Sequence, residues 1–271
     1  MSRKRLTQVF PFLLPLRKWQ RKKLFYLEML LDGNRYTKKK SETLLPNTVF
    51  KTSSLMLNEN SGFDMQYQIN KVHNLKLAAK TINKVIIAPN DTFSFWQLVR
   101  RADRHEKYKD GLELVNGSIV GSYGGGLCQL SNMLFWLFLH TPMRIVERHG
   151  HGIESFPSTT EDLPCGTDAT IYEGWLDLKV RNDTDNTFQI EISFDDSFMY
   201  GRILSQTPVS IDYKVFNSTV FYVKREEKNY QIATVCRSET DRVTGAQTEK
   251  ELYINKCEIA YALPADANIE E

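Results

Sequence analysis

One cysteine follows three consecutive glycines in the run Tyr123–Ser131. Glycine lets the backbone enter positive φ, and a loop that opens a helix leaves several backbone N–H groups without partners. Those groups and the positive end of the helix dipole favour a thiolate at Cys128 and can also stabilise an oxyanion. The pattern therefore predicts a cysteine nucleophile, although a tight turn followed by a core cysteine has the same spacing. The loop residues assigned to this site are Gly124, Gly125, Gly126, Gln129 and Ser131.

Two histidines downstream are candidate bases for this thiol. His149 and His151 lie two residues apart in Arg144–His151, which we expect to be a strand, so both side chains can face the preceding helix. Asp168, at the start of the next expected strand, can orient the imidazole as a third member, although such a carboxylate is also common in turns and caps. The two histidines also suggest a metal site. Because no clear third ligand is nearby, we expect neither a metal nor a cofactor.

The helix that would carry Cys128 is the clearest element of the sequence. Apolar residues surround the segment Leu127–His140, which predicts a buried helix that ends at Thr141–Pro142. Beyond it the hydrophobic period changes from about 3.6 to about 2 residues, which is typical of strands. We therefore expect an α+β fold in which a buried central helix packs on antiparallel β-sheet. A cysteine helix followed by a histidine strand is also the order of papain-like and NlpC-like folds, which is an analogy.

The other helices and strands are predicted from the same two hydrophobic periods, about 3.6 residues for helices and about 2 for strands. Helices are expected at Lys18–Leu31 and His73–Val85, and Gly111–Val120 alternates as a hairpin with its turn at Asn116–Gly117. Further strands are expected at Asp168–Tyr172, Trp175–Arg181, Phe188–Phe194, Val209–Val215, Val220–Val223, Gln231–Cys236 and Lys250–Ile259. We expect residues 1–60 to form an N-terminal basic and helical extension, residues 201–263 a C-terminal β-rich extension, and residues 264–271 a disordered acidic tail.

Charge and hydropathy restrict the partners and the location. The 271 residues include 35 Lys and Arg against 33 Asp and Glu, a net charge of +2, so we expect no nucleic acid partner. The apolar run Val9–Leu16 is too short for a signal peptide or a membrane span. We expect a cytoplasmic protein, or a peripheral one at the inner face of the membrane, where the basic N-terminus can contact anionic lipid. An extracellular location stays open. Cys236 and Cys257 are expected to be buried free thiols.

Five short motifs carry a resemblance to a known family. They occur in one order between residues 67 and 200, at that family's spacing, and read NLKLAA, TFSF, GGGLCQLS, VERHGH and GTDAT. Together they resemble the VanW family, so residues 61–200 are expected to form a VanW-like domain. The motifs are Asn74–Ala79, Thr92–Phe95, Gly124–Ser131, Val146–His151 and Gly166–Thr170.

The resemblance implies an accessory role in vancomycin or glycopeptide resistance and cell-wall metabolism. In some members of the family the domain is linked to L,D-transpeptidase-type cross-linking, with the motif cysteine as nucleophile. By this resemblance, Cys128 would attack a carbonyl of a peptidoglycan stem peptide or precursor. His151 is the better match to the family histidine, with His149 second, and Asp168 matches the family aspartate. A non-catalytic module that binds cell-wall precursors or resistance partners is the alternative.

Overall fold

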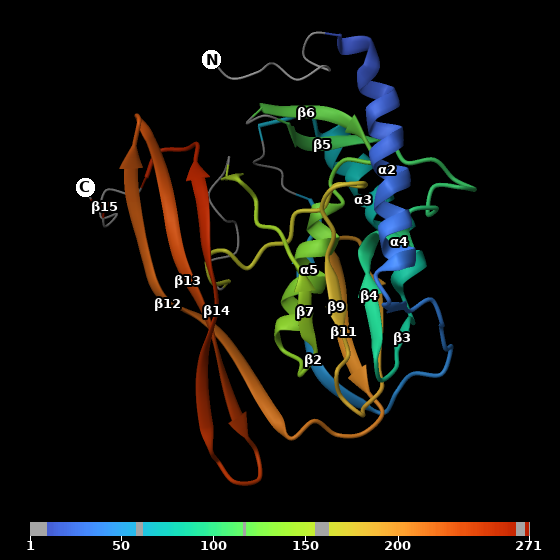
Figure 1. The fold of residues 1–271 in the computed structure, drawn as a ribbon, viewed down its shortest axis with the longest axis vertical. Coiled ribbons are helices and arrows are strands. Elements are labelled where there is room, and N and C mark those ends of the chain that lie inside the picture. Colours follow the sequence, from blue (N-terminus) through green and yellow to red (C-terminus); the bar gives the residue numbers. More distant parts are fainter. Residues whose placement is uncertain (1–9, 58–61, 116–117, 155–162, 264–268, 271) are drawn as a thin grey trace.

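The computed structural model describes residues 10–57, 62–115, 118–154, 163–263 and 269–270. The helical elements are η1 (Pro11–Leu13), α2 (Leu14–Leu31), α3 (Met65–Ile82), α4 (Phe95–Val99) and α5 (Cys128–Leu139). The strands form three sheets and one hairpin, with helix α5 among them and helix α2 at the outer edge (Figure 1). The hairpin consists of β5 (Asp110–Val115) and β6 (Ser118–Tyr123).

Most neighbouring strands in the three sheets run antiparallel, and short parallel pairs lie at the edges. The first sheet has the order β1 (Arg35–Tyr36), β4 (Asp91–Ser94), β9 (Lys179–Arg181), β7 (Arg144–Glu147). The second has the order β2 (Asn47–Leu55), β11 (Phe198–Ser205), β10 (Phe188–Phe194), β3 (Ile86–Ile87). The third has the order β15 (Ile269–Glu270), β12 (Ile211–Arg225), β13 (Lys228–Asp241), β14 (Gln247–Ile259), β8 (Ile153–Glu154).

Helix α5 lies at the centre of the molecule, between the second sheet and the long strands β12–β14 (Figure 1). Leu130, Leu134 and Leu137 have no exposed surface, and burial of apolar side chains on nearly every side stabilises the helix in this place. The helix packs directly on β11 at Gly201, where an added Cβ would lie 2.8 Å from a Leu137 methyl carbon. The predicted α+β class with a buried central helix is confirmed.

Two expected strands differ from the structure. Strand β7 ends at Glu147, so His149 and His151 lie in an irregular segment between β7 and β8. The segment Asp168–Tyr172 is not a strand, and only Tyr172 forms an isolated bridge, with Leu176. The predictions failed here because side chains and a neighbouring loop, rather than a paired strand, bind the backbone of this segment.

Other expectations hold with shifted limits. The hairpin β5–β6 is confirmed, while its predicted turn at Asn116–Gly117 lies outside the described residues. The two short strands expected at Val209–Val215 and Val220–Val223 form the single strand β12, which has a register shift between Asn217 and Thr219. In the C-terminal tail, the described pair Ile269–Glu270 lies parallel to β12, contrary to the expected disorder. Cys236 and Cys257 are buried free thiols, as expected.

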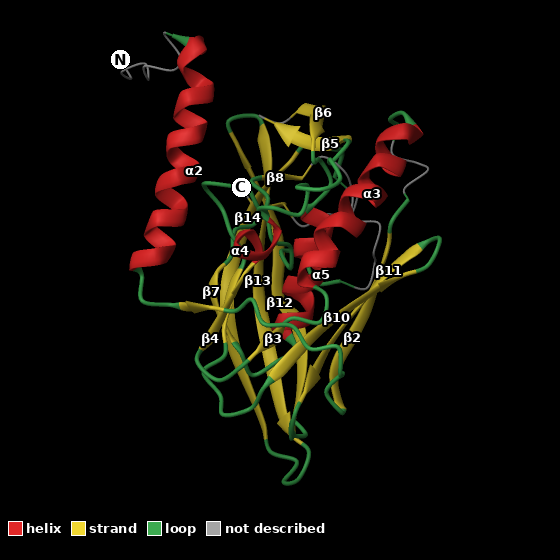
Figure 2. Cartoon of the chain, turned by 90° about the vertical axis from the view of Figure 1, so that its right-hand side faces the viewer, coloured by secondary structure: helices red, strands yellow, loops and turns green. Residues whose placement is uncertain are grey.

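Helix α2 lies along one edge of the molecule, which Figure 2 shows most clearly. Its inner face buries Phe25 and Met29 against the core, and Tyr26 Oη donates to Glu173 Oε1 at 2.6 Å. Its outer face is exposed. Among the helices of the described residues, none is both long enough and apolar enough to cross a bilayer.

Candidate functional site

The glycine loop between β6 and α5 has a shape that side chains would prevent. Gly124 and Gly126 have φ of +75° and +94°, in the left-handed region that favours glycine. Gly125 lies against the backbone of Gly111 in β5, and a Cβ on Gly125 would come within 2.4 Å of the Gly111 carbonyl. The three glycines thus let the chain pass closely beside the hairpin and enter α5 with Cys128 as its first residue.

Asn74 of α3 holds this loop in place. Its side chain is completely buried, and its Nδ2 donates to the carbonyl oxygens of Gly125 at 3.0 Å and Lys109 at 2.8 Å. Its Oδ1 accepts from the Lys109 amide at 2.8 Å. Since a buried amide left unpaired is unfavourable, these three bonds fix the loop to α3. The asparagine of the NLKLAA motif therefore positions the cysteine loop.

Cys128 is half-buried at the N-terminus of α5. Within the described part of the chain, the backbone amides of Leu127 and Cys128 donate to no acceptor, so both remain free at the positive end of the helix. The Cys128 side chain also packs against the apolar core. The Cys128 side chain thus packs on hydrocarbon at the end of the helix that carries these N–H groups.

His151 and Asp168 form a paired acid and base beside this thiol. The Nδ1 atom of His151 hydrogen-bonds Asp168 Oδ2, and the His151 backbone amide donates to the same oxygen at 2.6 Å. Burial alone would lower the pKa of His151, but its interactions with Asp168 and Cys128 outweigh burial and raise that pKa to about 10. Burial likewise opposes ionisation of Asp168, but His151 and Arg148 hold the pKa of that carboxyl below its usual value. With Nδ1 engaged, Nε2 is the ring nitrogen left for a reacting group.

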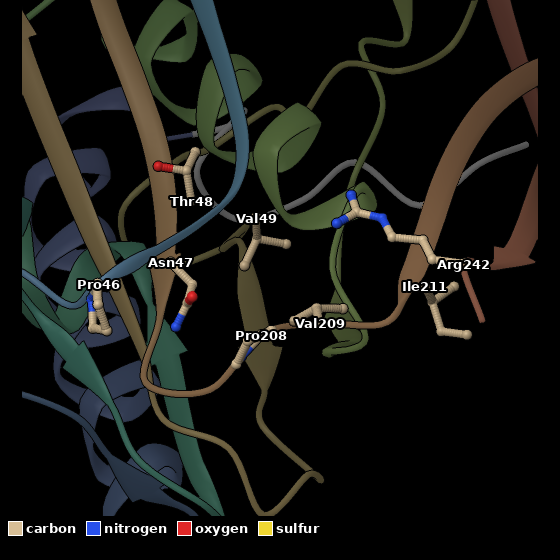
Figure 3. A pocket seen from close by; sticks show the side chains of 8 residues that line it. All are labelled: Pro46, Asn47, Thr48, Val49, Pro208, Val209, Ile211 and Arg242. Carbon is tan, nitrogen blue, oxygen red and sulfur yellow. The ribbon is translucent and has the colours of Figure 1, made fainter.

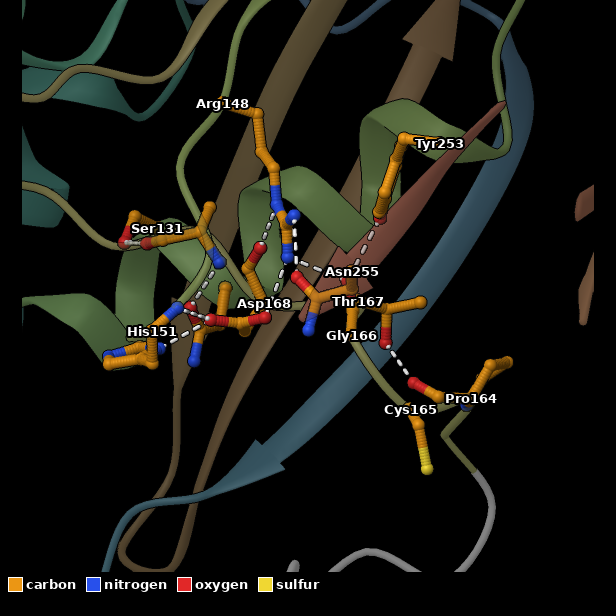
Figure 4. Close-up of polar contacts among 12 residues, drawn as sticks. Ser131, Arg148, His151, Pro164, Cys165, Gly166, Thr167, Asp168, Tyr253 and Asn255 are labelled. Atoms are coloured by element: carbon orange, nitrogen blue, oxygen red, sulfur yellow. Dashed lines mark hydrogen bonds and ion pairs between the residues drawn. The ribbon is translucent and has the colours of Figure 1, made fainter. Parts of the chain in front are cut away.

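Arg148 fixes Asp168 in this orientation (Figure 4). Its guanidinium donates to Asp168 Oδ1 at 2.7 Å, to the Asp168 carbonyl at 2.6 Å and to the Gly166 carbonyl at 2.6 Å. It also donates to Asn255 Oδ1 at 3.0 Å and lies 4.7 Å from the ring centroid of Tyr253. Asn255 and Tyr253 belong to β14, and Tyr253 Oη donates to the Gly166 carbonyl at 3.0 Å. The C-terminal sheet therefore takes part in building the site.

Two residues of the cysteine motif bind neighbouring backbone instead of lining the loop. Ser131 Oγ donates to the Ala169 carbonyl at 2.6 Å, which ties α5 to the segment that carries Asp168. Gln129 Nε2 donates to Ser54 Oγ at 2.8 Å and to the Leu55 carbonyl at 2.6 Å, which ties the start of α5 to β2. Of the predicted loop residues, the structure brings the three glycines to the thiol, while Gln129 and Ser131 anchor the helix.

His149 does not join Cys128. Its Nε2 lies 3.1 Å from Glu147 Oε1, and Glu147 also pairs with Lys179 at 2.9 Å. The structure thus brings together Cys128, His151 and Asp168 and separates His149 from them. Across the residues that the structure describes, no three His, Cys, Asp or Glu side chains gather as a potential metal site.

Lys71 is a neighbour of the loop that the sequence analysis missed. Its aliphatic stem covers Gly126, because a Cβ on that glycine would lie 2.3 Å from Lys71 Cγ. Burial lowers the pKa of Lys71 to about 8, and Lys71 forms no ion pair with an acidic side chain of the described residues.

The sequence also did not predict four other residues of the site, namely Arg148, Asn74, Tyr253 and Asn255. Arg148 and Asn74 lie inside the quoted motifs, whereas the two β14 residues have no local signal in the sequence.

A cavity of about 250 Å³ lies elsewhere, between the start of β2 and the start of β12 (Figure 3). The charge of Arg242 at this cavity is paired with Asp212. The cavity shares no residue with the Cys128 cluster. Its lining consists of Pro46, Asn47, Thr48, Val49, Pro208, Val209, Ile211 and Arg242.

Comparison with known proteins places this geometry in a family. The family model described as "VanW like protein" matches residues 70–204, which include Asn74, the glycine loop, Cys128, His151 and Asp168. The vancomycin B-type resistance protein VanW of Enterococcus faecalis is 50% identical over 272 residues, covering 100% of this chain and 99% of that protein. The chain belongs to the VanW family. The uncharacterised protein YoaR of Bacillus subtilis is 37% identical over 110 residues, 41% of this VanW-family chain and 35% of YoaR. No solved structure matches.

We expect Arg148→Met to destabilise this VanW-family protein by about 2–3 kcal/mol, because it leaves the half-buried Asp168 carboxylate without its guanidinium partner. The matched control is Arg144→Met, which removes a surface ion pair with Asp183 and should cost at most about 1 kcal/mol. Urea unfolding of both variants measures the two values. Equal losses from the two substitutions would contradict the role given to Arg148.

Proposed function

We propose that this protein is a cysteine-dependent acyl-transfer enzyme that acts on peptidoglycan stem peptides or their precursors, as an accessory of glycopeptide resistance. The observation that carries the proposal is the Asp168–His151 hydrogen bond beside Cys128 at the N-terminus of α5, with the thiol near enough to help raise the pKa of His151. The role in glycopeptide resistance is supported by 50% sequence identity, over the whole chain, to a protein named for vancomycin B-type resistance. The cysteine helix followed by a histidine segment supports the analogy with L,D-transpeptidase-like, papain-like and NlpC-like chemistry.

The proposed reaction has two steps with a covalent intermediate. The Cys128 thiolate attacks the peptide carbonyl carbon, the His151 imidazolium gives its proton to the leaving amine, and a thioester forms. An acceptor amine then attacks the thioester, gives its proton to the neutral imidazole, and releases the thiolate. The free amides of Leu127 and Cys128 are suited to hold the oxyanion in both steps. Asp168 orients His151 and stabilises its charged form.

Lys71 suits a substrate that carries a carboxylate. Its ammonium group extends from the stem that covers Gly126, two residues before Cys128, and it has no acidic partner among the side chains described. With a pKa of about 8 it is mostly protonated at neutral pH. A stem peptide contains free carboxylates, so a peptide bound at the thiol can neutralise this buried charge.

A second function is favoured by the contact of Cys128 with the apolar core. In that case the cysteine is a packing residue, and the glycine loop recognises a cell-wall precursor or a resistance partner without covalent chemistry. Both functions use the same loop. They differ in whether the sulfur reacts.

We expect iodoacetamide to alkylate Cys128 faster than Cys165, because burial raises the pKa of the Cys165 thiol. His151→Gln should slow alkylation of Cys128 at pH 7 by at least about tenfold, since the charged partner of the thiolate is lost. His149→Gln is the matched control and should leave the rate unchanged. Peptide mass spectrometry follows each cysteine separately. Equal alkylation of Cys128 and Cys165, or equal effects of the two histidine substitutions, would count against a cysteine nucleophile.

Cys128→Ser should abolish the protein's contribution to vancomycin resistance in a host whose resistance depends on it. Serine preserves the size of the side chain and the loop, but its hydroxyl is a far weaker nucleophile than a thiolate at neutral pH. Minimal inhibitory concentrations for wild type and variant give the result, and thermal unfolding of the purified variant shows that it is folded. Full resistance with a folded Cys128→Ser protein would favour the binding module instead.

A further inference from the structure

Helix α2 has two apolar faces, of which only one is used by the fold. The inner face packs on the body of the protein through Phe25 and Met29. On the opposite face, positions three or four apart form what we call the outer stripe, since such spacing places side chains in one line along a helix. Its four apolar members are 48–77% exposed. The outer stripe consists of Leu16, Trp19, Lys23, Leu27 and Leu30.

The charges of helix α2 are mainly basic. The helix carries five basic residues and a single acidic one, Glu28. Lys22 pairs with Glu173 at 2.6 Å, and Arg21 lies over the ring of Trp175. Arg17 and Lys18 are exposed and form no ion pair with any described acidic residue. An exposed apolar stripe that contains Lys23, on a helix whose charges are mainly basic, complements an anionic surface that has hydrocarbon beneath it.

The position of Lys23 favours a membrane over a second copy of this chain as the partner of the outer stripe. It lies in the middle of the outer stripe, with its ammonium 5.7 Å from the ring centroid of Trp19. Two such stripes packed together would bury lysines in an apolar seam, which is unfavourable. At a bilayer the same side chain can extend its stem through the apolar layer and place its ammonium among the headgroups. Tryptophan is also a residue favoured at that boundary.

We propose that the outer stripe of α2 binds the surface of an anionic lipid bilayer, with the helix lying parallel to that surface. At about 1.5 Å per residue, the outer stripe from Leu16 to Leu30 gives a contact line of about 21 Å. The N-terminal end of α2 lies at the same end of the molecule as the β5–β6 hairpin, which leads into the cysteine loop (Figures 1 and 2). Binding through this face leaves the inner contacts of the helix intact.

Co-sedimentation of the purified full chain with vesicles tests this proposal. Vesicles of phosphatidylcholine mixed with phosphatidylglycerol should bind the protein, whereas phosphatidylcholine alone or high salt should weaken binding because the basic residues no longer contribute. The emission of Trp19 should shift to shorter wavelength on binding, and Trp19→Phe should remove that shift.

Substitutions in the outer stripe provide the control. Trp19→Ser with Leu30→Ser should lower the vesicle partition coefficient at least about tenfold, since two large apolar side chains are lost from the contact. The matched pair Val243→Ser with Ile254→Ser removes exposed apolar residues from the β13–β14 turn and from β14, and should leave partitioning unchanged. Absence of binding to anionic vesicles, or equal losses in both double variants, would overturn the proposal. So would a stripe-dependent dimer in sedimentation that does not bind vesicles.

Discussion

The half-buried Asp168 carboxylate is the constraint on which the rest of the site depends. One of its oxygens accepts from the backbone amide and the ring of His151, and the other accepts from Arg148. A carboxylate that is largely removed from water is stable only when its charge is compensated in this way. The compensation also fixes His151, since the aspartate holds its ring from one side and leaves the other side for the thiol. The position of the His151 ring beside the thiol thus follows from the compensation of one half-buried charge.

The same requirement explains why distant parts of the chain are needed. Arg148 must itself be held, and its guanidinium rests against Tyr253 and Asn255 of β14, about a hundred residues further along the chain. On the other side, Ser131 and Asn132 of α5 bind the backbone of Ala169. The segment that carries Asp168 is therefore clamped between the central helix and the C-terminal sheet. It has no strand partner of its own, which is why its backbone groups are available to these side chains.

The parts of the fold that the sequence predicted are those with local causes. The apolar periodicity around Leu134 and the alternation of Phe188–Phe194 each depend on neighbouring residues alone, and both elements occur as expected. Cys128, His151 and Asp168 could be named because they lie in recognisable motifs. The predicted strand Arg144–His151 is wrong beyond Glu147. There the His151 amide donates to the Asp168 side chain instead of to a neighbouring strand. Tyr253 and Asn255 could not be anticipated, because their contribution comes only from tertiary contact.

The most direct measurement is an NMR titration of the His151 imidazole in the wild type and in Asp168→Asn. If Asp168 and Cys128 hold the ring in its charged form, His151 of the wild type stays protonated until its pKa of about 10, and Asp168→Asn brings the pKa down towards the ordinary value of about 6.5. The pair then contributes stability fully below about pH 6.5 and loses that contribution as the pH rises through about 10. A wild-type His151 that titrates at or below about 6.5, unchanged by Asp168→Asn, would contradict a charged imidazole held between Asp168 and Cys128.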